Sequence, residues 1–167
     1  MTQSTPRKSS FPPVIDPAVR ILICGSLPGD RSLAAQQYYA HPQNQFWRLI
    51  SAAIDRDLTA LAYPDRLAGL LEAHIGLWDV VATAHRPGST DAALSEIAPN
   101  DIASLAATLP QLRTIAFNGG TALKHGLKQL GATRYTTVAL PSSSPLHTVG
   151  FDRKLPAWME LRDHLRH

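Results

Sequence analysis

Four short loops carry most of the residues in this chain that could do chemistry, and each of them follows an apolar segment. They are rich in glycine, serine, proline and amides, and they span residues 25–30 (GSLPGD), 83–89 (TAHRPGS), 118–120 (NGG) and 141–148 (PSSSPLHT). Small residues leave backbone N–H groups open to an acceptor such as a carbonyl or phosphate oxygen. The loops therefore predict a site for a ligand that offers such oxygens.

The segment 36–50 (QQYYAHPQNQFWRLI) combines aromatic rings with neutral amides just ahead of an apolar helical run. A buried core needs the rings and not the amides, whereas a solvated loop needs the amides and not the rings. A surface that receives a flat, hydrogen-bonding ligand uses both.

Asp79 is a carboxylate at the end of an apolar run, where burial requires that its oxygens be satisfied. It either caps neighbouring backbone N–H groups or accepts N–H donors from a bound heterocycle.

The loop at residues 141–148, called the serine loop below, has two interpretations. Ser142 to Ser144 with His147 could supply a nucleophile and a base, but a Gly-x-Ser-x-Gly elbow is missing and no acid is placed to orient the histidine. Three small hydroxyls between prolines suit contacts with a phosphate backbone better. Leu146, an apolar residue in this polar loop, either wedges into a stack of bases or folds inward.

Metal and redox chemistry are not indicated by the sequence. Cys24 is the single cysteine, and His41 and His85 lack the spacing of metal ligands. We expect no cofactor and no metal. The net charge of +3 and the isoelectric point near 9.3 are compatible with a polyanionic partner.

The elements that position these loops can be predicted from apolar patterning. Continuous apolar runs at 20–24, 75–81, 113–117 and 135–140 are typical of strands covered on both faces. Segments with helical spacing lie between them, which predicts a parallel sheet with helices on both sides. In such sheets ligands bind outside the carboxyl ends of the strands. We expect helices at 42–53 with Pro42 in the first turn, 63–74, 102–109 capped by Asn100, 121–130 capped by Thr121, and 156–165.

Length and composition favour one globular domain over residues 11–167, preceded by a flexible basic arm at residues 1–10. The arm carries Arg7 and Lys8 and lacks the apolar core of a secretory signal. No apolar run approaches the roughly 20 residues of a membrane span. We expect a cytoplasmic monomer of bacterial type that acts at the nucleoid and has no membrane partner.

Taken in order, these segments resemble the uracil-DNA glycosylase superfamily. Residues 25–29 (GSLPG) are similar to the Gly-Ile-Asn-Pro-Gly of the mismatch-specific uracil and thymine glycosylases, and 39–47 (YAHPQNQFW) to their FAHPxNRFW. Residues 117–120 (FNGG) and 140–147 (LPSSSPLH) resemble their Phe-Asn-Gly segment and their Pro-Ser-Ser-Ser loop. The resemblance covers nearly the whole chain and implies an α/β fold of three layers, α/β/α, with a central, mainly parallel four-stranded sheet.

Two positions depart from the mismatch-specific pattern and from ordinary uracil glycosylases. Leu27 stands where a water-activating asparagine is found, and Leu140 where a catalytic histidine or asparagine is found. The chain most resembles the hypoxanthine-DNA (deoxyinosine) glycosylase branch, which shares the Gly-Ser-x-Pro opening, the YYAHPxNxFW stretch, the segment 79–91 and the PND at 99–101. In that branch the asparagine that corresponds to Asn44 is implicated in catalysis.

The resemblance implies a monofunctional DNA glycosylase of base-excision repair, which flips hypoxanthine out of double- or single-stranded DNA and hydrolyses its N-glycosidic bond. Asn44 would position water or polarise the leaving base, and the N–H groups of Ser26 and Leu27 would stabilise its charge. Asp79 would accept the N1–H of hypoxanthine and repel the N1 lone pair of adenine. Contacts with the base are expected from Gly25, Tyr39, Asp79 and Asn118. Contacts with DNA are expected from Ser142, Ser143, Ser144, Pro145, Leu146 and His147.

Three other functions remain open from the sequence. The nearest is a uracil or G:T/U mismatch-specific glycosylase of the same fold. A second is a non-catalytic module that binds damaged DNA, and a third is a hydrolase of free nucleotides, which would lack salt-dependent affinity for a duplex.

Overall fold

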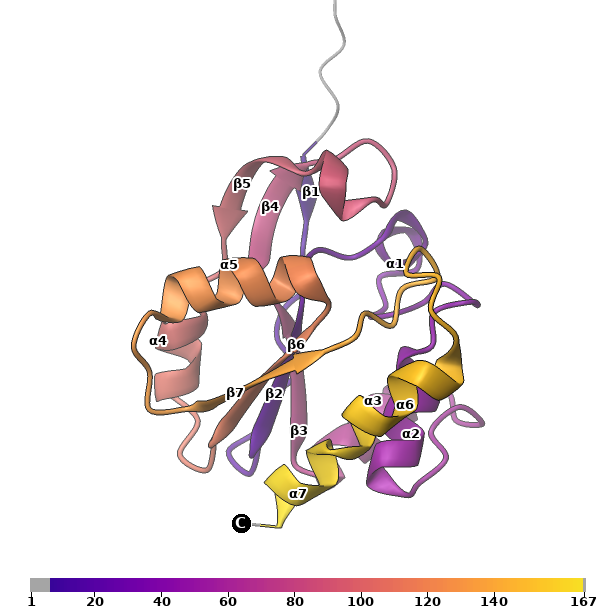
Figure 1. Ribbon diagram of the computed structural model, residues 1–167, viewed down its shortest axis with the longest axis vertical. Coiled ribbons are helices and arrows are strands. Elements are labelled where there is room, and N and C mark those ends of the chain that lie inside the picture. The colour runs from indigo at the N-terminus through magenta and orange to yellow at the C-terminus, as the bar shows by residue number, and fades with distance from the viewer. Residues whose placement is uncertain (1–6, 167) are drawn as a thin grey trace, which may run out of the picture.

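A computed structural model describes residues 7–166 of the protein. Its centre is a parallel four-stranded sheet in the order β3 (Ile75–Asp79), β2 (Ile21–Gly25), β6 (Thr114–Asn118) and β7 (Thr136–Leu140), as Figure 1 shows. The register places Gly25 opposite Asp79 on β3, and Asn118 opposite Leu140 on β7. The expected parallel four-stranded sheet is therefore confirmed.

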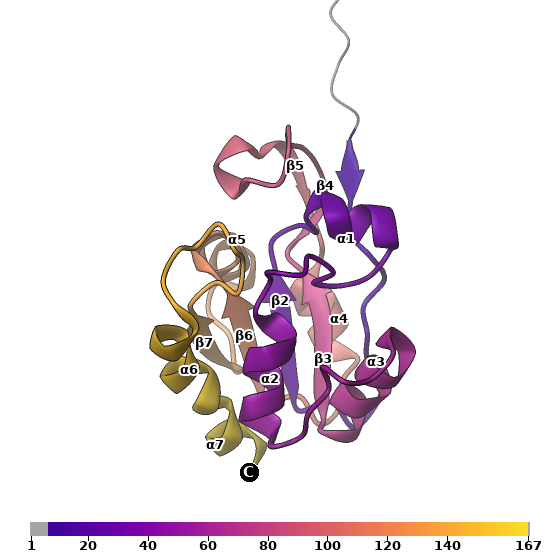
Figure 2. The same cartoon turned by 90° about the vertical axis from the view of Figure 1, so that its right-hand side faces the viewer.

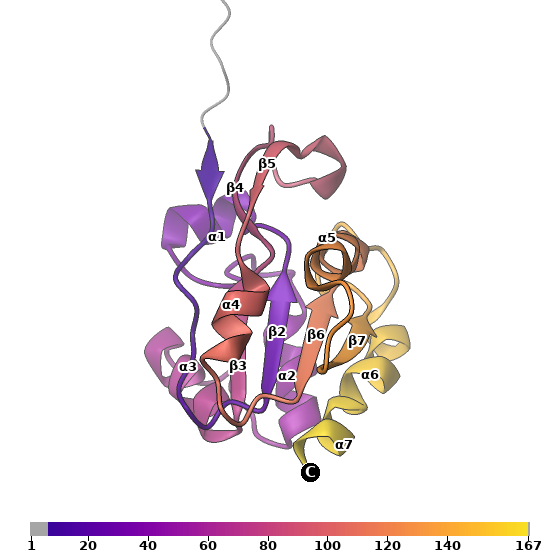
Figure 3. The ribbon, with the colours of Figure 1, turned by 90° about the vertical axis from the view of Figure 1, so that its left-hand side faces the viewer.

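Two separate apolar cores lie on the two faces of this sheet, because successive side chains of a strand point to opposite faces. Ile21 and Ile23 of β2 join one core, and Leu22 and Cys24 join the other. The first core is covered by α2 (Phe46–Ile54), α3 (Tyr63–Glu72), α6 (Phe151–Met159) and α7 (Leu161–Leu165), most of which lie in front of the sheet in Figure 2. The second is covered by α4 (Ile102–Ala107) and α5 (Gly120–Leu130), seen in Figure 3.

A small antiparallel sheet that the sequence did not predict lies beyond the carboxyl ends of the main strands. Its order is β1 (Lys8–Ser9), β4 (Val81–His85) and β5 (Ser95–Pro99). The run 75–81 had been predicted as one strand, but the main sheet ends at Asp79. Val80 then donates its N–H to the Gly25 carbonyl at 2.8 Å, and the chain leaves to pair with β5. The excursion between β4 and β5 contains the short 3-10 helix η1 (Asp91–Ala93).

The amino-terminal segment also differs from its prediction as a flexible arm at residues 1–10. Residues 1–6 lie outside the described part of the chain, but Lys8–Ser9 form β1 against β4, and Ser10 donates its N–H to the Ala82 carbonyl at 2.8 Å. The Lys8 ammonium contacts both Asp30 Oδ1 and the Gly88 carbonyl at 2.5 Å. Residues 8–10 are thus part of the fold.

One predicted helix start and one predicted helix cap are wrong because nearby side chains bind the backbone differently. The helix expected from Pro42 is α2 and begins at Phe46, whose N–H is held by Asn44. Asp101, and not Asn100, caps α4 by accepting the Ser104 N–H at 3.0 Å.

Helix α5 begins at Gly120, ahead of the predicted Thr121 cap. The last helical region starts at Phe151, with Pro156 inside α6. Helix α1 (Asp30–Ala35) was not predicted. None of the helices in residues 7–166 is long and apolar enough to cross a membrane.

Candidate functional site

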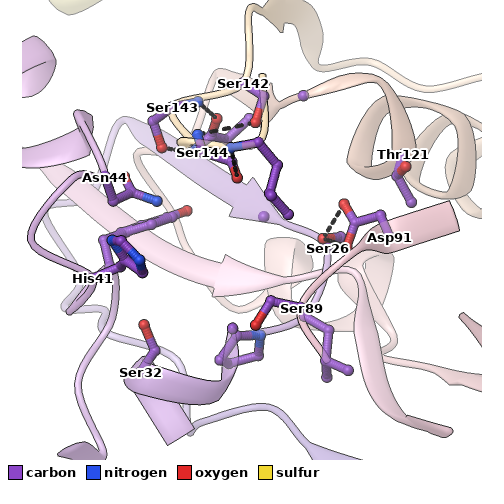
Figure 4. Close-up of a pocket in the computed structure, with 18 of the residues that line it drawn as sticks. Ser26, Ser32, His41, Asn44, Ser89, Asp91, Thr121, Ser142, Ser143 and Ser144 are labelled. Atoms are coloured by element: carbon purple, nitrogen blue, oxygen red, sulfur yellow. Dashed lines mark hydrogen bonds between the residues drawn. The ribbon is translucent and has the colours of Figure 1, made fainter. Parts of the chain in front are cut away.

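The loops that follow β2, β4, β6 and β7 line a cavity of about 450 Å³, together with Asp79 at the end of β3 and the segment between α1 and α2. Its volume lies within the usual range for small-molecule sites, roughly 300–1,000 Å³. Figure 4 shows part of its lining. The structure brings every residue predicted for the site to this cavity: Gly25, Ser26, Leu27, Tyr39, Asn44, Asp79, Asn118, Ser142, Ser143, Ser144, Pro145, Leu146 and His147. Their separate roles remain predictions.

Asp79 and Tyr39 meet at the Gly25 end of this cavity. A Cβ atom on Gly25 would lie 2.7 Å from Asp79 Oδ1 and 3.0 Å from the Tyr39 hydroxyl, so the backbone at this position has no room for a side chain. Asp79 is 3% exposed, and its Oδ2 makes no hydrogen bond within residues 7–166. The predicted capping of backbone N–H groups by this oxygen is therefore not seen, and a ligand could satisfy it.

The environment of Asp79 disfavours its charged form. Burial, helped by the negative charge of Asp91 and opposed by the guanidinium of Arg86, raises the pKa of this carboxyl from 3.8 to about 7. At neutral pH both the protonated and the ionised forms are therefore populated.

The Tyr39 ring is held as a wall of the cavity by packing and by an unusual backbone. Its φ of 56° lies in the left-handed region, which is costly for a non-glycine residue and suggests a functional constraint. The ring stacks on Phe46 with centroids 4.0 Å apart and planes at 21°. Burial and the charge of Asp79 raise the pKa of the Tyr39 hydroxyl, so it stays protonated at neutral pH.

The side chain of Asn44 is fixed by the start of α2. Its Oδ1 accepts the N–H of Phe46 at 2.9 Å, and its backbone N–H donates to the His41 carbonyl at 2.9 Å. The amide NH₂ of Asn44 makes no hydrogen bond to the described part of the chain. Figure 4 shows Asn44 and His41 on one side of the pocket and Ser26 and Asp91 on the other. The group that Asn44 leaves unpaired is thus a hydrogen-bond donor.

The turn after β2 has free N–H groups on its pocket side. The carbonyls of Gly25 and Ser26 accept the N–H groups of Val80 and Val81 at 2.8 and 3.0 Å. Because a trans peptide points its C=O and the following N–H in opposite directions, the N–H groups of Ser26 and Leu27 face away from those partners. Neither N–H donates a hydrogen bond within residues 7–166. The Leu27 side chain is buried in the second core, so only its backbone could act on a ligand.

The side chain of Asn118 holds the serine loop in place through two hydrogen bonds to Ser143. The amide of Asn118 donates to Ser143 Oγ and accepts the Ser143 N–H, both at 2.9 Å, while the Gln45 N–H donates to the Ser143 carbonyl at 3.0 Å. Ser143 is 1% exposed, and its hydrogen bonds brace the loop, while its contact with DNA remains a prediction. The bond to the Ser143 N–H occupies one lone pair of the Asn118 oxygen.

At the rim of the loop Leu146 is 58% exposed, so the inward-folded alternative is wrong. Its N–H is held by the Ser144 hydroxyl at 3.1 Å. His147 is exposed next to it.

Arg86 and Asp91 lie in segments that the sequence singles out, 83–89 and 79–91, but neither they nor Lys154 were predicted as functional residues. Arg86 is fully buried and Asp91 bonds Ser26, whereas Lys154 lies buried beneath the serine loop with its ammonium 3.5 Å from the Ser144 carbonyl. Charged residues are rarely buried, so nothing in the local sequence marks Arg86 or Lys154 as buried, and Asp91 is only partly buried.

A parallel α/β sheet whose carboxyl edge presents aromatic, amide and serine loops to a single cavity defines the class of this protein. Residues 12–162 match the model of the uracil DNA glycosylase superfamily, and the chain belongs to that superfamily. The resemblance inferred from its motifs is therefore confirmed.

Among its relatives, the chain is 44% identical to a protein named hypoxanthine DNA glycosylase from Methanosarcina acetivorans, over 82% of this chain and 86% of that one. It is 40% identical to a protein of the same name from Methanosarcina barkeri, over 92% and 97% of the two chains. A solution NMR structure of a candidate uracil DNA glycosylase from Methanosarcina acetivorans superposes with a TM-score of 0.84 at 40% identity, over 96% and 99% of the chains. These relatives are archaeal and give no support to the expected bacterial type.

Proposed function

We propose that the protein is a monofunctional DNA glycosylase that releases hypoxanthine from deoxyinosine in DNA. The observation that carries the proposal is the buried, unpartnered Oδ2 of Asp79 at a cavity of nucleobase size. The names of the two Methanosarcina relatives support the same activity. The proposal also includes the expectations that the substrate is double- or single-stranded DNA, that the protein is a monomer and that it is located in the cytoplasm.

Asp79 reads the edge of the flipped base. Hypoxanthine carries a hydrogen on N1, which an ionised carboxylate accepts in a charge-assisted hydrogen bond. Adenine has a lone pair at N1, which the same carboxylate repels. Discrimination against normal adenine therefore rests on the ionised form of Asp79.

Tyr39 and Leu146 serve the extrusion of the base. A glycosylase must take its target out of the helix, which costs stacking and pairing energy. The ring of Tyr39, braced by Phe46, offers a flat surface to the base. Stacking on such a ring contributes about 1–3 kcal/mol per base. Leu146, exposed at the rim, fills the gap that the base leaves in the duplex.

The bond between the sugar and the base is hydrolysed by water. Water adds to C1′ as the C1′–N9 bond breaks and its electron pair leaves with the base. One proton of the water is lost to solvent, the departing base takes up a proton, and an abasic sugar remains. The donor groups of Asn44 and of the Ser26 and Leu27 backbone stabilise the negative charge that develops on the base. Since an amide is a poor base, Asn44 acts by donating hydrogen bonds and by holding water.

The test is a single-turnover assay on end-labelled duplexes that carry deoxyinosine, deoxyuridine or deoxyadenosine at one position, with alkali revealing each abasic site. Wild type should cut the deoxyinosine strand and leave deoxyadenosine intact. Asn44→Ala should cut at least about 100-fold more slowly, the loss typical of removing one stabilising donor. Gln43→Ala is the matched control, because this exposed amide is the neighbour of Asn44 and does not line the cavity.

Other results would assign another function. Uracil also offers an N–H beside a carbonyl, so faster cutting of the deoxyuridine strand would make the protein a uracil glycosylase. Binding of the deoxyinosine duplex without any abasic product would make it a non-catalytic binder. Release of hypoxanthine from free inosine alone would make it a nucleoside hydrolase.

A further inference from the structure

Arg86 holds the turn after β2 from outside the cavity. Its guanidinium is fully buried and donates to the carbonyls of Leu27 at 3.3 Å, Pro28 at 2.6 Å and Gly88 at 2.9 Å. Two consecutive carbonyls of the turn are thus directed at one cation. Such a fork of donors fixes the direction of both peptide groups.

Asp91 joins Arg86 to the cavity. Its two carboxylate oxygens accept the Ser26 hydroxyl at 2.9 and 2.8 Å, and its Oδ1 lies 3.7 Å from Arg86 Nη1. Figure 4 shows the bonds between Asp91 and Ser26 at the edge of the pocket. A further bond, from the Asp30 N–H to Ser89 Oγ at 2.9 Å, ties the same two loops together.

These contacts leave the turn little freedom to rotate. On the β4 side the Gly25 and Ser26 carbonyls are bound by backbone N–H groups, and the next two carbonyls are bound by Arg86. The free N–H groups of Ser26 and Leu27 lie between these two anchored regions. Their direction therefore depends on the contact of Ser26 with Asp91 and on the placement of Arg86.

We propose that Asp91 is a positioning residue for cleavage of the N-glycosidic bond: through Ser26 and Arg86 it keeps the 25–28 turn in the form that directs two backbone N–H groups at the departing base. This inference rests on the glycosylase activity proposed above. Asp91 acts through other groups and does not react with the substrate.

Because Asp91 is charged, replacing it should also change the pH dependence of excision, which the loss of a purely structural contact would leave unchanged. Asp91 raises the pKa of Asp79, and Arg86 lowers it. The other titratable groups around Asp79 are Cys24 on β2 and the hydroxyls of Tyr38 and Tyr39, and burial raises the pKa of each so that all three are neutral near pH 7. Burial raises the pKa of Asp91 itself, while the hydrogen bond from Ser26 and the charges of Arg86 and of His125 on α5 act to lower it. Removing the charge of Asp91 should therefore lower the pKa of Asp79 and shift the pH at which excision begins toward acid.

The experiment compares Asp91→Asn with Asp101→Asn. Asp101 is a matched control, since its carboxylate also accepts a serine hydroxyl, Ser104 Oγ at 2.7 Å, but on the exposed start of α4. Single-turnover excision of deoxyinosine is followed from pH 5.5 to 9, and affinity for the same duplex is measured by fluorescence anisotropy. Asp91→Asn should lower the plateau rate about 10-fold or more, leave Kd within about threefold, and move the midpoint to lower pH, while Asp101→Asn changes none of the three.

A plateau rate equal to wild type, an unshifted midpoint, or a loss confined to Kd would each overturn the assignment of Asp91. If Asp91→Asn does not fold, judged by circular dichroism, Ser26→Ala decides. That smaller change removes only the hydroxyl bound to Asp91, and a slowed rate at unchanged Kd supports the proposal whereas a wild-type rate overturns it. Failure of the wild-type protein to cut deoxyinosine would instead refute the proposed function.

Discussion

Replacing Asp79 by asparagine should make the folded protein more stable above pH 7, although the same change harms its proposed function. The reason is that the Asp79 carboxyl is buried, with Oδ2 unpaired, and its pKa is raised from 3.8 to about 7. Between these two values the folded protein holds a proton that the unfolded chain has already lost. The free energy of unfolding therefore falls as pH rises through this window and changes no further from this cause above pH 7.

The size of the effect follows from the shift. One pKa unit corresponds to about 1.4 kcal/mol, so a shift from 3.8 to about 7 corresponds to about 4 kcal/mol of lost stability at pH 8.5. Asparagine has nearly the same shape and no charge. Because the unfolded chain has already lost most of this proton at pH 4.5, Asp79→Asn should gain about 3 kcal/mol of this amount relative to wild type between pH 4.5 and pH 8.5.

Urea unfolding of both proteins at the two pH values measures the gain, because effects of pH common to both cancel in the difference. Asp101→Asn is again the control. Hydrogen bonds from Ser104 lower the pKa of the exposed Asp101, so this carboxyl stays ionised from pH 4.5 to 8.5 in the folded protein. The stability of the control should therefore follow that of wild type over this range. If the difference between wild type and Asp79→Asn is the same at pH 4.5 and 8.5, the Asp79 site does not penalise charge and the argument about its ionisation is refuted.

Three further predictions concern activity. The rate of deoxyinosine excision by wild type should rise as pH increases through about 7, because the ionised Asp79 is the stronger acceptor. The pH–rate profile of Asp79→Asn should lack this rise, and this variant should discriminate less strongly against deoxyadenosine. Gly25→Ala should lose most excision while keeping its affinity for undamaged DNA in an anisotropy assay, since the added methyl carbon would lie 2.7 Å from Asp79 Oδ1; full activity would contradict the described geometry. Tyr39→Ala should slow excision of a paired deoxyinosine by about 5- to 150-fold, the equivalent of 1–3 kcal/mol of stacking, and a smaller loss on single-stranded substrate would show that the ring acts in extrusion.

The parts of the fold that the sequence predicts are those determined by local patterns. Apolar runs marked all four strands of the main sheet, although β7, at the edge of the sheet, is mostly exposed and is not covered on both faces as predicted. Asp79 and Asn118 were correctly placed at one edge because parallel strands end on the same side. Leu146 was correctly singled out as unusual, but only its exposure in the structure decides between the two interpretations.

What the sequence did not predict depends on contacts between distant segments. Arg86 is buried because the carbonyls of Leu27 and Pro28, 59 and 58 residues away, replace its water. The short strand at Lys8–Ser9 exists because β4 leaves the main sheet and offers an edge to pair with. The start of α2 and the cap of α4 were misplaced for a local reason, since Asn44 and Asp101 bind backbone N–H groups at the starts of these helices.

The ammonium of Lys8 joins Asp30, which follows the first pocket loop, to Gly88 in the second. Segments that precede the first strand of a domain core often tolerate changes, but here such a segment, through Lys8, holds together two loops next to the binding cavity. Trimming the first ten residues, or attaching a bulky partner to them, would loosen two walls of the cavity at once. Preparations of this enzyme that differ only in their amino-terminal extension should not be assumed to be kinetically equivalent.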